Sequence, residues 1–418
     1  MNTIIALHNL RDYAPGLRNR DNNGQTKTVY VGGVPRTKFS TASVKRPMRQ
    51  IMFPETIVSS HLNDMIAIYI QDQIDAGVFD ADDKATLQTA FEEAICVIKK
   101  SGDKDEKKSK KSEKAEGDGG KDEAKKGRQA VSYQRQTLLA ILAALTKDVQ
   151  ENGVPEDDRL AQLAKKVYDA SPVDPCNALL GVMSTHSVME TVYAAVAIAD
   201  PIGINRYAGD TDYWTHAGYS GAVDANTPKF LRMWQAQEAA NPGSENLGFQ
   251  DITADTMYQY AHIDVRTFVQ NMQRHDEAAG TVTDVTPIAQ KTFTDFFTLL
   301  MTTAPSAKQA TNASIPACEI AYFEVIEDGQ PVSMSWGNPI AYDKVNKKSV
   351  AAQGIEQMAR FAKDDTFRTG KITRYVMLGA QHADKRALFE DAGVQVIGNL
   401  NELREVLKTV TATAIENL

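Results

Sequence analysis

The sequence predicts an α+β fold with a small core in the ferredoxin-like manner, to which two appendages are attached. Short apolar runs typical of strands are interleaved with amphipathic helical segments in the first and last parts of the chain. Residues 54–170 read instead as a purely helical stretch. Residues 202–250 are rich in Gly, Asn and Asp but keep several aromatic side chains. We therefore expect a strand-and-helix core, a helical subdomain and a projecting insertion.

The core elements are predicted from their apolar patterns, and those of the tail alternate between strand and helix. The segment "VYAAVAIADP" fits a strand or a helix equally well, because periodicity does not decide between them. The predicted strands are "TIIALHNL" (3–10), "VPRTKFS" (34–40), "MYQYAHIDV" (257–265), "CEIAYFEVI" (318–326), "KITRYVML" (371–378) and "VQVIG" (394–398). The predicted helices are a short basic one after residue 40, one around 293–300, "ADKRALFEDAG" (383–393) and "NELREVLKTV" (401–410).

Three helices are predicted within residues 54–170, because apolar side chains recur on one helical face. The first is expected to begin behind a cap at Asp82 or Asp83. Residues 101–128 have no aromatic or branched apolar side chain to bury, so we expect a disordered surface loop there. The three faces are Leu87, Phe91, Ala94, Ile95 and Ile98; Leu138, Ile141, Leu142, Leu145 and Val149; and Leu160, Leu163 and Val167.

Charge is distributed unevenly along the 418 residues, whose net charge is -8. Residues 1–50 contain nine Lys or Arg and two acids, Asp12 and Asp21, which gives this segment a balance of +7. Such asymmetry indicates an anionic partner at one localised site. The three cysteines form no CxxC pair, and we find no signal peptide and no apolar run of membrane-spanning length. We expect a cytoplasmic globular protein without a membrane partner.

The basic charge is concentrated in residues 18–49, which hold eight Lys or Arg beside Ser and Thr hydroxyls. A strand followed by a helix leaves free backbone N–H groups at the helix start, which favour an anion. Gly32 and Gly33 allow a ligand backbone to approach closely. Together these features describe a phosphate-binding edge. Composition alone leaves open the alternative that this is a solvated basic surface.

The arrangement resembles the CasC family, the backbone subunit of type I-E CRISPR Cascade complexes. "LRNRDNNGQTKTVYVGGVPRTKFSTASVKRPMR" is similar to its Asn-Arg-Asp loop, Gly-Gly step, basic strand and Ser-x-x-Ser-x-Lys-Arg-x-x-Arg helix. "NLGFQDITADTMYQYAHIDVRTFVQNM" resembles its Leu-Gly-x-Gln segment and following strand, and "TTAPSAKQATNAS" its Pro-x-Ala-Lys-Gln segment. Three matches in the same order are fairly specific. One departure is Pro47, which suggests that the basic helix begins later or bends.

The resemblance implies a hand-shaped subunit with an RRM-like palm, helical fingers and a protruding thumb. Copies would line up along one CRISPR RNA in a helical filament and display the guide for pairing with a target DNA strand. Further partners would be the large PAM-recognising subunit, the small subunit, the 5′-end capping subunit and the processing endonuclease bound to the 3′ hairpin. The expected domains are palm in 1–53, 171–201 and 251–418, fingers in 54–170, and thumb in 202–250.

The resemblance also implies which side chains contact RNA. A holder of variable guides is expected to grip the phosphates, which carry no sequence information. Thumb side chains and a palm methionine would pack against a displaced base. The alternatives are that Trp214 anchors the small core of the insertion and that Met183 fills a core. The implied backbone contacts are Arg20, Lys27, Lys45, Arg46 and Arg49, supported by Arg36, Lys38, Ser40 and Ser43; the implied packing residues are Trp214, Thr215, Leu247 and Met183; Lys308 and Gln309 lie in a recurring segment, and their role stays open.

We expect no enzyme, metal or cofactor. The seven histidines form no HxH, HExxH or HxxxH pair, and there is no GxSxG or GxxxxGK[ST] motif. Two alternatives remain open. One is an RRM-like endonuclease that processes CRISPR RNA, with His8 or His216 as general acid or base, or with Asp21 near the guide. The other is a stand-alone RNA-binding regulator.

Overall fold

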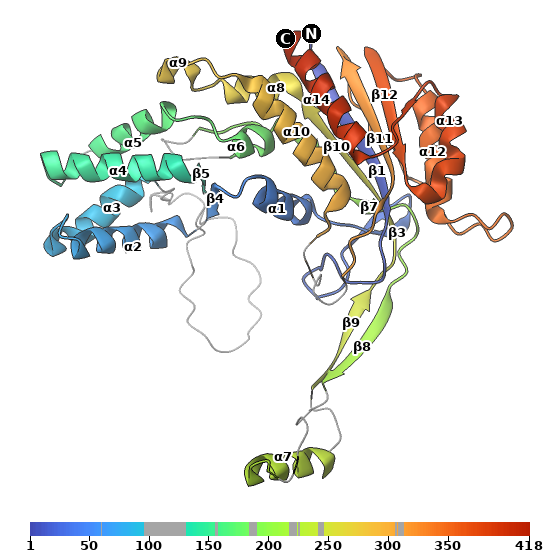
Figure 1. The fold of residues 1–418 in the computed structure, drawn as a ribbon, viewed down its shortest axis with the longest axis horizontal. Helices are drawn as coiled ribbons and strands as arrows, with labels where there is room; N and C mark the ends of the chain where they lie inside the picture. Colours follow the sequence, from blue (N-terminus) through green and yellow to red (C-terminus); the bar gives the residue numbers. More distant parts are fainter. Residues whose placement is uncertain are drawn as a thin grey trace, which may run out of the picture. The chain divides into compact units, whose positions relative to one another are not determined.

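The computed structural model describes residues 1–59, 61–95, 131–154, 158–183, 190–216, 224, 226–240, 246–305, 307 and 313–418. The chain forms two compact units (Figure 1). The sheet unit comprises Met1–Met48, Ile198–His262 and Phe293–Val410, and the helical unit comprises Arg49–Ala197, Ile263–Thr292 and Thr411–Leu418. The segment predicted to be disordered, 101–128, lies outside the described residues. Among the residues described, no helix has the length and apolarity needed to cross a bilayer.

A mixed sheet dominates the sheet unit, in the order β13-β12-β11-β1-β10-β6, with β7 paired to β10. β1 is antiparallel to β11 and β11 to β12, whereas β12 and β13 are parallel. Five of the six predicted core strands are therefore present in this sheet, and "VYAAVAIADP" contributes one short strand; the sixth, "VPRTKFS", forms part of a separate ribbon instead. The strands are β1 (Thr3–Asp12), β6 (Val196–Ile198), β7 (Ile202–Gly203), β10 (Thr256–Asp264), β11 (Cys318–Glu327), β12 (Lys371–Leu378) and β13 (Gln395–Val396).

The central strands are buried on both faces, which explains their nearly continuous apolar sequences. On one face, Ile320 and Tyr322 of β11 join a core with α12 (Val350–Lys363) and α13 (Arg386–Glu390). On the other, the ring of Phe323 lies 5.4 Å from that of Phe297 on α10 (Val285–Thr302). The unit also contains the 3-10 helix η2 (Ala380–Lys385) and residues 400–410 of α14 (Leu400–Glu416), which is labelled in Figure 1.

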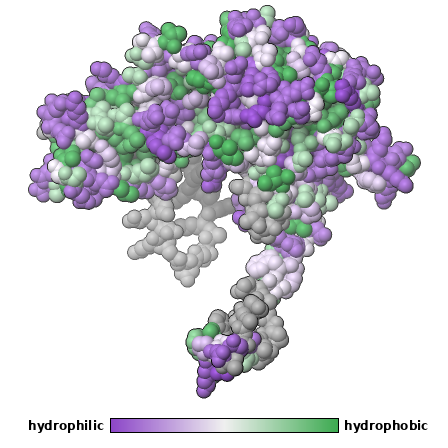
Figure 2. Space-filling model, in the orientation of Figure 1, coloured by the Kyte–Doolittle hydropathy of each residue, from purple (hydrophilic) through white to green (hydrophobic). Residues whose placement is uncertain are grey.

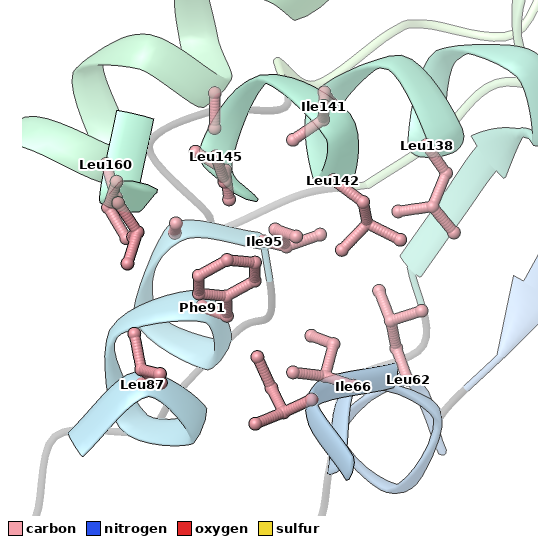
Figure 3. Close-up of a cluster of buried hydrophobic side chains, with 14 of the residues drawn as sticks. Leu62, Ile66, Leu87, Phe91, Ile95, Leu138, Ile141, Leu142, Leu145 and Leu160 are labelled. Atoms are coloured by element: carbon pink, nitrogen blue, oxygen red, sulfur yellow. The ribbon is translucent and has the colours of Figure 1, made fainter. Parts of the chain in front are cut away.

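The helical unit has its own apolar core, in which the predicted helical faces meet (Figure 3). Phe91, Ile95, Ile141 and Leu145 are fully buried there. In the third helix Leu160 is buried, together with Ala164 and Tyr168, whereas Leu163 and Val167 are partly buried. Ile98 lies outside the described residues. The main elements are α2 (Leu62–Asp75), α3 (Lys84–Ile95), α4 (Arg135–Asn152), α5 (Arg159–Asp169), α6 (Pro175–Leu180), α8 (Val265–Met272) and α9 (Asp276–Ala279).

Two details of the predicted helices are wrong. The cap before α3 is Asp80, whose carboxylate accepts the Asp82 N–H at the start of the 3-10 turn η1 (Ala81–Asp83). The predicted caps Asp82 and Asp83 lie inside that turn. The basic helix α1 (Thr41–Met52) begins before Pro47 and continues through it, so the later start expected from Pro47 is wrong, whereas the bend stays a prediction. Buried Val44 and Met48 flank the proline and hold the helix in place at the loss of one helical hydrogen bond.

Three two-stranded ribbons complete the described structure. In the sheet unit, β2 (Thr28–Val31) pairs with β3 (Val34–Thr37), and β8 (Asp210–His216) pairs with β9 (Asn246–Ile252). The helix α7 (Lys229–Ala240) lies between β8 and β9 in the sequence, and hydrophilic and hydrophobic side chains both show on its surface (Figure 2). In the helical unit, β4 (Thr56–Ser59) pairs with β5 (Val131–Gln134).

Candidate nucleic-acid interface

The start of the basic helix α1 is closed by the protein's own acceptors. Asp200 Oδ1 accepts the Thr41 N–H at 2.6 Å, and Lys38 Nζ lies 2.7 Å from Asp200 Oδ2. Burial opposes ionisation of Asp200, but the contacts from Lys38 and Thr41 outweigh it and lower the pKa of its carboxyl. The Ser40 carbonyl accepts the Ser43 N–H at 2.9 Å and the Ser43 hydroxyl at 2.7 Å. The expectation of free N–H groups for an anion is therefore not met at these positions, and Lys38, Ser40 and Ser43 stabilise the helix start.

Two arginines of the basic segment are buried and hold backbone carbonyls. Arg36 is fully buried and donates to the carbonyls of Gly203, Ile204, Trp336 and Gly337 at 2.7–3.4 Å. Arg18 donates to the Ala14 carbonyl and to the Ser314 hydroxyl. Burial lowers the pKa of both guanidinium groups. In this conformation Arg36 faces carbonyls rather than solvent, so we assign it a structural role.

A pocket of about 510 Å³ gathers the remaining parts of the motif. Arg20 comes from the Asn-Arg-Asp loop, and Ser43 and Arg46 come from α1; Arg20 and Arg46 are exposed. Pro305 and Ala307 of the "TTAPSAKQATNAS" segment line the same pocket. Arg20 and Ala307 are nearly 300 residues apart in the sequence, and both line this cationic pocket. Asp21 also lines it, but its Oδ1 accepts the N–H groups of Asn23 and Gln25.

The other predicted cations differ in their surroundings. Lys27 and Lys45 are half-buried, and the backbone of Lys27 pairs with that of Asn19 and Lys38. Arg49 is half-buried and belongs to the helical unit, where its charge acts on Asp174 and Cys176. Within the part of the chain that the structure describes, no carboxylate forms an ion pair with Arg20, Lys27 or Arg46.

The ribbon β8–β9 separates two residues that the sequence places side by side. Trp214 lies opposite Gly248, and a Cβ at Gly248 would come within 2.6 Å of the indole ring. Thr215 lies opposite Leu247, and because neighbouring strand residues alternate, this pair faces the other side. Trp214 is 47% and Leu247 57% exposed, so both remain accessible. The structure therefore brings Thr215 and Leu247 together and points Trp214 away from them.

Met183, in the helical unit, is 83% exposed and follows the bridge between Val182 and Val192, so it does not fill a core. Lys308 and Gln309 lie outside the described residues, as does the side chain of His216. His8 is completely buried, with its ring bonded to the Tyr258 hydroxyl at 2.8 Å. In this conformation His8 cannot reach a phosphate as a general acid or base. Among the described residues, no cluster of His, Cys, Asp and Glu side chains has the arrangement of a metal site.

Sequence reasoning missed three carboxylates that hold the basic segment in place. Asp200 closes α1, Asp251 accepts the Thr26 N–H at 2.8 Å, and Asp255 accepts the Thr37 hydroxyl at 2.7 Å. Each lies more than 150 residues from its partner, so local patterns did not indicate the pairs. The only signal was that Asp251 and Asp255 fall within the second resembling segment.

The described fold occurs in solved structures. A chain of the "CRISPR RNA-guided surveillance complex, pre-nicking" matches with a TM-score of 0.64 and 17% identity over 98% of this chain and 100% of that one. A chain of a "CRISPR RNA-guided surveillance complex" matches with a TM-score of 0.59 and 15% identity over 98% and 99%. No curated protein matches this sequence. The sequence does match the Cas_CT1975 family, described as CT1975-like protein, over residues 5–405. Because that match covers nearly the whole sequence, the chain belongs to the CT1975-like protein family.

Proposed function

We propose that this protein is the CRISPR RNA-binding backbone subunit of a type I-E Cascade surveillance complex. The observation that carries the proposal is the pocket where Arg20, Ser43 and Arg46 meet Pro305 and Ala307. The fold of chains from CRISPR RNA-guided surveillance complexes supports it. In this proposal the sheet unit supplies the RRM-like palm, the helical unit includes the fingers, and residues 202–250 form the thumb.

The chemistry of the pocket suits a guide of variable sequence. Arg20 and Arg46 offer exposed guanidinium groups, which bind phosphate oxygens without reading a base. Lys27, Lys45 and Arg49 would extend this contact along the backbone. The buried Arg18 and Arg36 do not compete for the phosphates, because they are inaccessible and their terminal nitrogens are bonded to the protein. Copies joined head to tail would extend the site into a helical filament.

The thumb would act through the exposed side chains of the β8–β9 ribbon. Because Trp214 and the Thr215–Leu247 pair face opposite sides, one ribbon presents an aromatic and an aliphatic surface back to back. Such side chains pack against any base, since every base has a π-face. Met183 would take part from a neighbouring copy. The complex would act in the cytoplasm, where the exposed guide pairs with target DNA, and this subunit would hold RNA without cleaving it.

Co-expression with a CRISPR array tests the proposal. We expect a large particle on size-exclusion chromatography that contains guide-length RNA with mixed spacer sequences. Arg20→Ala with Arg46→Ala is expected to weaken binding and to reduce the salt dependence by about 0.7 for each lost phosphate contact. The matched control is Arg386→Ala with Lys408→Ala, which removes two exposed cations held by Glu390 and Glu405. A monomer that carries assorted transcripts would contradict the proposal in favour of a regulator.

Labelled precursor RNA, incubated with and without divalent metal ions, tests the absence of catalysis. We expect no cleavage product under either condition. Products that form with the purified protein and disappear in Asp21→Asn would replace the backbone role by that of a processing endonuclease. Asp21 is the residue to change, because it is the carboxylate that lines the cationic pocket.

A further inference from the structure

We propose that Tyr30, on the ribbon β2–β3, is a stacking platform for one base of the bound single-stranded nucleic acid. The inference rests on the proposed function and adds to it a contact site outside both the cationic pocket and the β8–β9 ribbon. Its starting point is an aromatic side chain that the fold does not use. Tyr30 is 75% exposed, although a tyrosine ring is among the side chains that contribute most when buried.

The ribbon directs this ring away from the protein's interior. Tyr30 pairs with Pro35, and the adjacent pair is Val29 with Arg36. Directly opposed residues share a face and successive pairs alternate, so Tyr30 points away from the buried Arg36. Arg36 is 0% exposed, whereas Tyr30 is open to solvent. The register of the ribbon thus directs Arg36 into the protein and Tyr30 away from it.

The ribbon is also held firmly, so the ring needs little ordering when a base binds. The Arg36 guanidinium donates to the Trp336 and Gly337 carbonyls at 3.1 and 3.4 Å. At the turn, Gly32 has φ +59°, and a Cβ there would lie 1.7 Å from the Gly337 oxygen. The turn therefore requires glycine for its backbone conformation and for its close approach to the loop. An aromatic ring on a fixed support loses little entropy on binding, which favours affinity.

The surroundings of Tyr30 favour a nucleic acid over a protein partner. Its exposed neighbours on the ribbon are Thr28, Gly32 and Gly33, which form no apolar patch. The strand begins directly after Lys27, and the preceding loop forms the bridge between Arg20 and Thr26. Three residues of strand span about 10 Å, so Lys27 lies within about 10 Å of Tyr30 along the backbone, although strand alternation directs its side chain to the opposite face of the ribbon. An exposed aromatic ring on a strand that follows a cationic segment is an arrangement on which single-stranded nucleic acids stack their bases.

The test uses the full-length protein and an unstructured RNA of mixed sequence that contains 2-aminopurine, whose fluorescence falls on stacking. Tyr30→Ala is expected to weaken binding about 5- to 150-fold at constant salt, while the slope of affinity against salt concentration stays unchanged. It should also restore part of the 2-aminopurine fluorescence. Tyr30→Phe, which keeps the ring, is expected to behave like wild type. The matched control is Phe367→Ala, because Phe367 is 87% exposed in the same unit.

The possible failures are distinguishable. If the wild-type protein binds no RNA, the proposed function fails and this inference fails with it. If wild type binds but Tyr30→Ala matches Phe367→Ala in affinity and fluorescence, only the stacking role is wrong. If Tyr30→Ala disrupts self-association without altering the 2-aminopurine signal of the bound RNA, the ring contacts a second copy of the chain instead, and the inference is overturned.

Discussion

Arg36 and Arg46 lie ten residues apart in one basic segment, yet the structure uses them in opposite ways. Arg36 is fully buried and bonded to four carbonyls of the sheet unit. Arg46 is exposed at a pocket, where no described carboxylate pairs with it. The comparison shows that the cations of residues 18–49 fall into two groups. Some are buried and hold the backbone together, and others are exposed and can bind an anion.

A third arginine, Arg368, extends the comparison because it is buried with a carboxylate instead of carbonyls. Its Nη1 lies 2.7 Å from Glu324 Oε2, and its guanidinium lies 4.3 Å from the centre of the Phe361 ring. Tyr322 donates its hydroxyl to Glu324 Oε1 at 2.7 Å. Burial opposes the charge on Glu324, but His8 and Arg368 outweigh it and lower the pKa of the carboxyl to about 2. The side chains of Arg368 and Glu324 are almost inaccessible to water, so their charges are stabilised by contacts within the protein rather than by solvent.

The largest expected effect is that of Glu324→Gln, which leaves the buried Arg368 without its counter-charge. Breaking a buried pair by removing one partner costs about 3–5 kcal/mol. We expect the amide protons of β1 and β11 to lose protection in hydrogen exchange, and the urea midpoint of the sheet unit to fall. The matched control is Glu327→Gln on the same strand, β11, which removes a more exposed pair with Lys371 of β12. Equal effects of the two substitutions would show that burial of the pair is unimportant.

Arg36→Met tests the carbonyl-bound arginine and is expected to destabilise the sheet unit by about 2–4 kcal/mol. The loss is smaller than for Glu324→Gln, because four carbonyls lose donors but no charge is left unpaired. Arg46→Met, the matched control in the same segment, is expected to change stability by less than about 0.5 kcal/mol and to weaken RNA binding instead. Urea unfolding and the salt dependence of RNA binding measure the two effects separately. A stable Arg36→Met protein with weakened RNA binding would reverse the assignment.

Local patterns predicted much of the fold but little of this division among cations. Helical periodicity identified Phe91 and Ile141 as core residues, since a face is determined by neighbours a few positions away. Arg36 and Arg46 are indistinguishable by such patterns, because the carbonyls that bury Arg36 lie 167 to 301 residues farther along the chain. The opposite directions of Trp214 and Thr215, in contrast, follow from strand alternation and could have been predicted from sequence.

The candidate site was predictable in its residue types and only partly in their roles. Arg20 and Arg46 were expected at an anion-binding place, and the pocket that joins them to Pro305 and Ala307 required the tertiary structure. Lys38 and Ser43 were expected to contact RNA; the structure pairs Lys38 with Asp200 and the Ser43 hydroxyl with the Ser40 carbonyl, while Ser43 also lines the pocket. A short strand followed by a serine-rich helix predicts backbone N–H and hydroxyl donors near the start of the helix. The pattern does not reveal that a distant residue such as Asp200 accepts their hydrogen bonds.

The smallest expected effect is a pH dependence of the free energy of unfolding. It distinguishes Arg368, which lies beside titratable groups, from Arg36, which is bonded to carbonyls. Burial lowers the pKa of His8 below its usual 6.5, even though Glu324 lies 3.7 Å away, so the unfolded chain binds a proton that the folded chain does not. The contribution of neutral His8 to the free energy of unfolding is therefore complete above pH 6.5. It decreases as the pH falls below 6.5, by at most about 1.4 kcal/mol per pH unit. The contribution of Glu324, whose folded pKa is about 2, is present above 4.5 and is lost only as the pH falls toward 2.

The contrast appears in the mutants when urea unfolding is measured from pH 8 to pH 4. His8→Phe is expected to flatten the loss of stability between pH 6.5 and pH 5. Arg36→Met is expected to differ from wild type by a constant amount over that range, because its carbonyl partners do not titrate. If the difference in unfolding free energy between Arg36→Met and wild type varied with pH, a titrating group would also interact with Arg36. Its partners would then not be carbonyls alone.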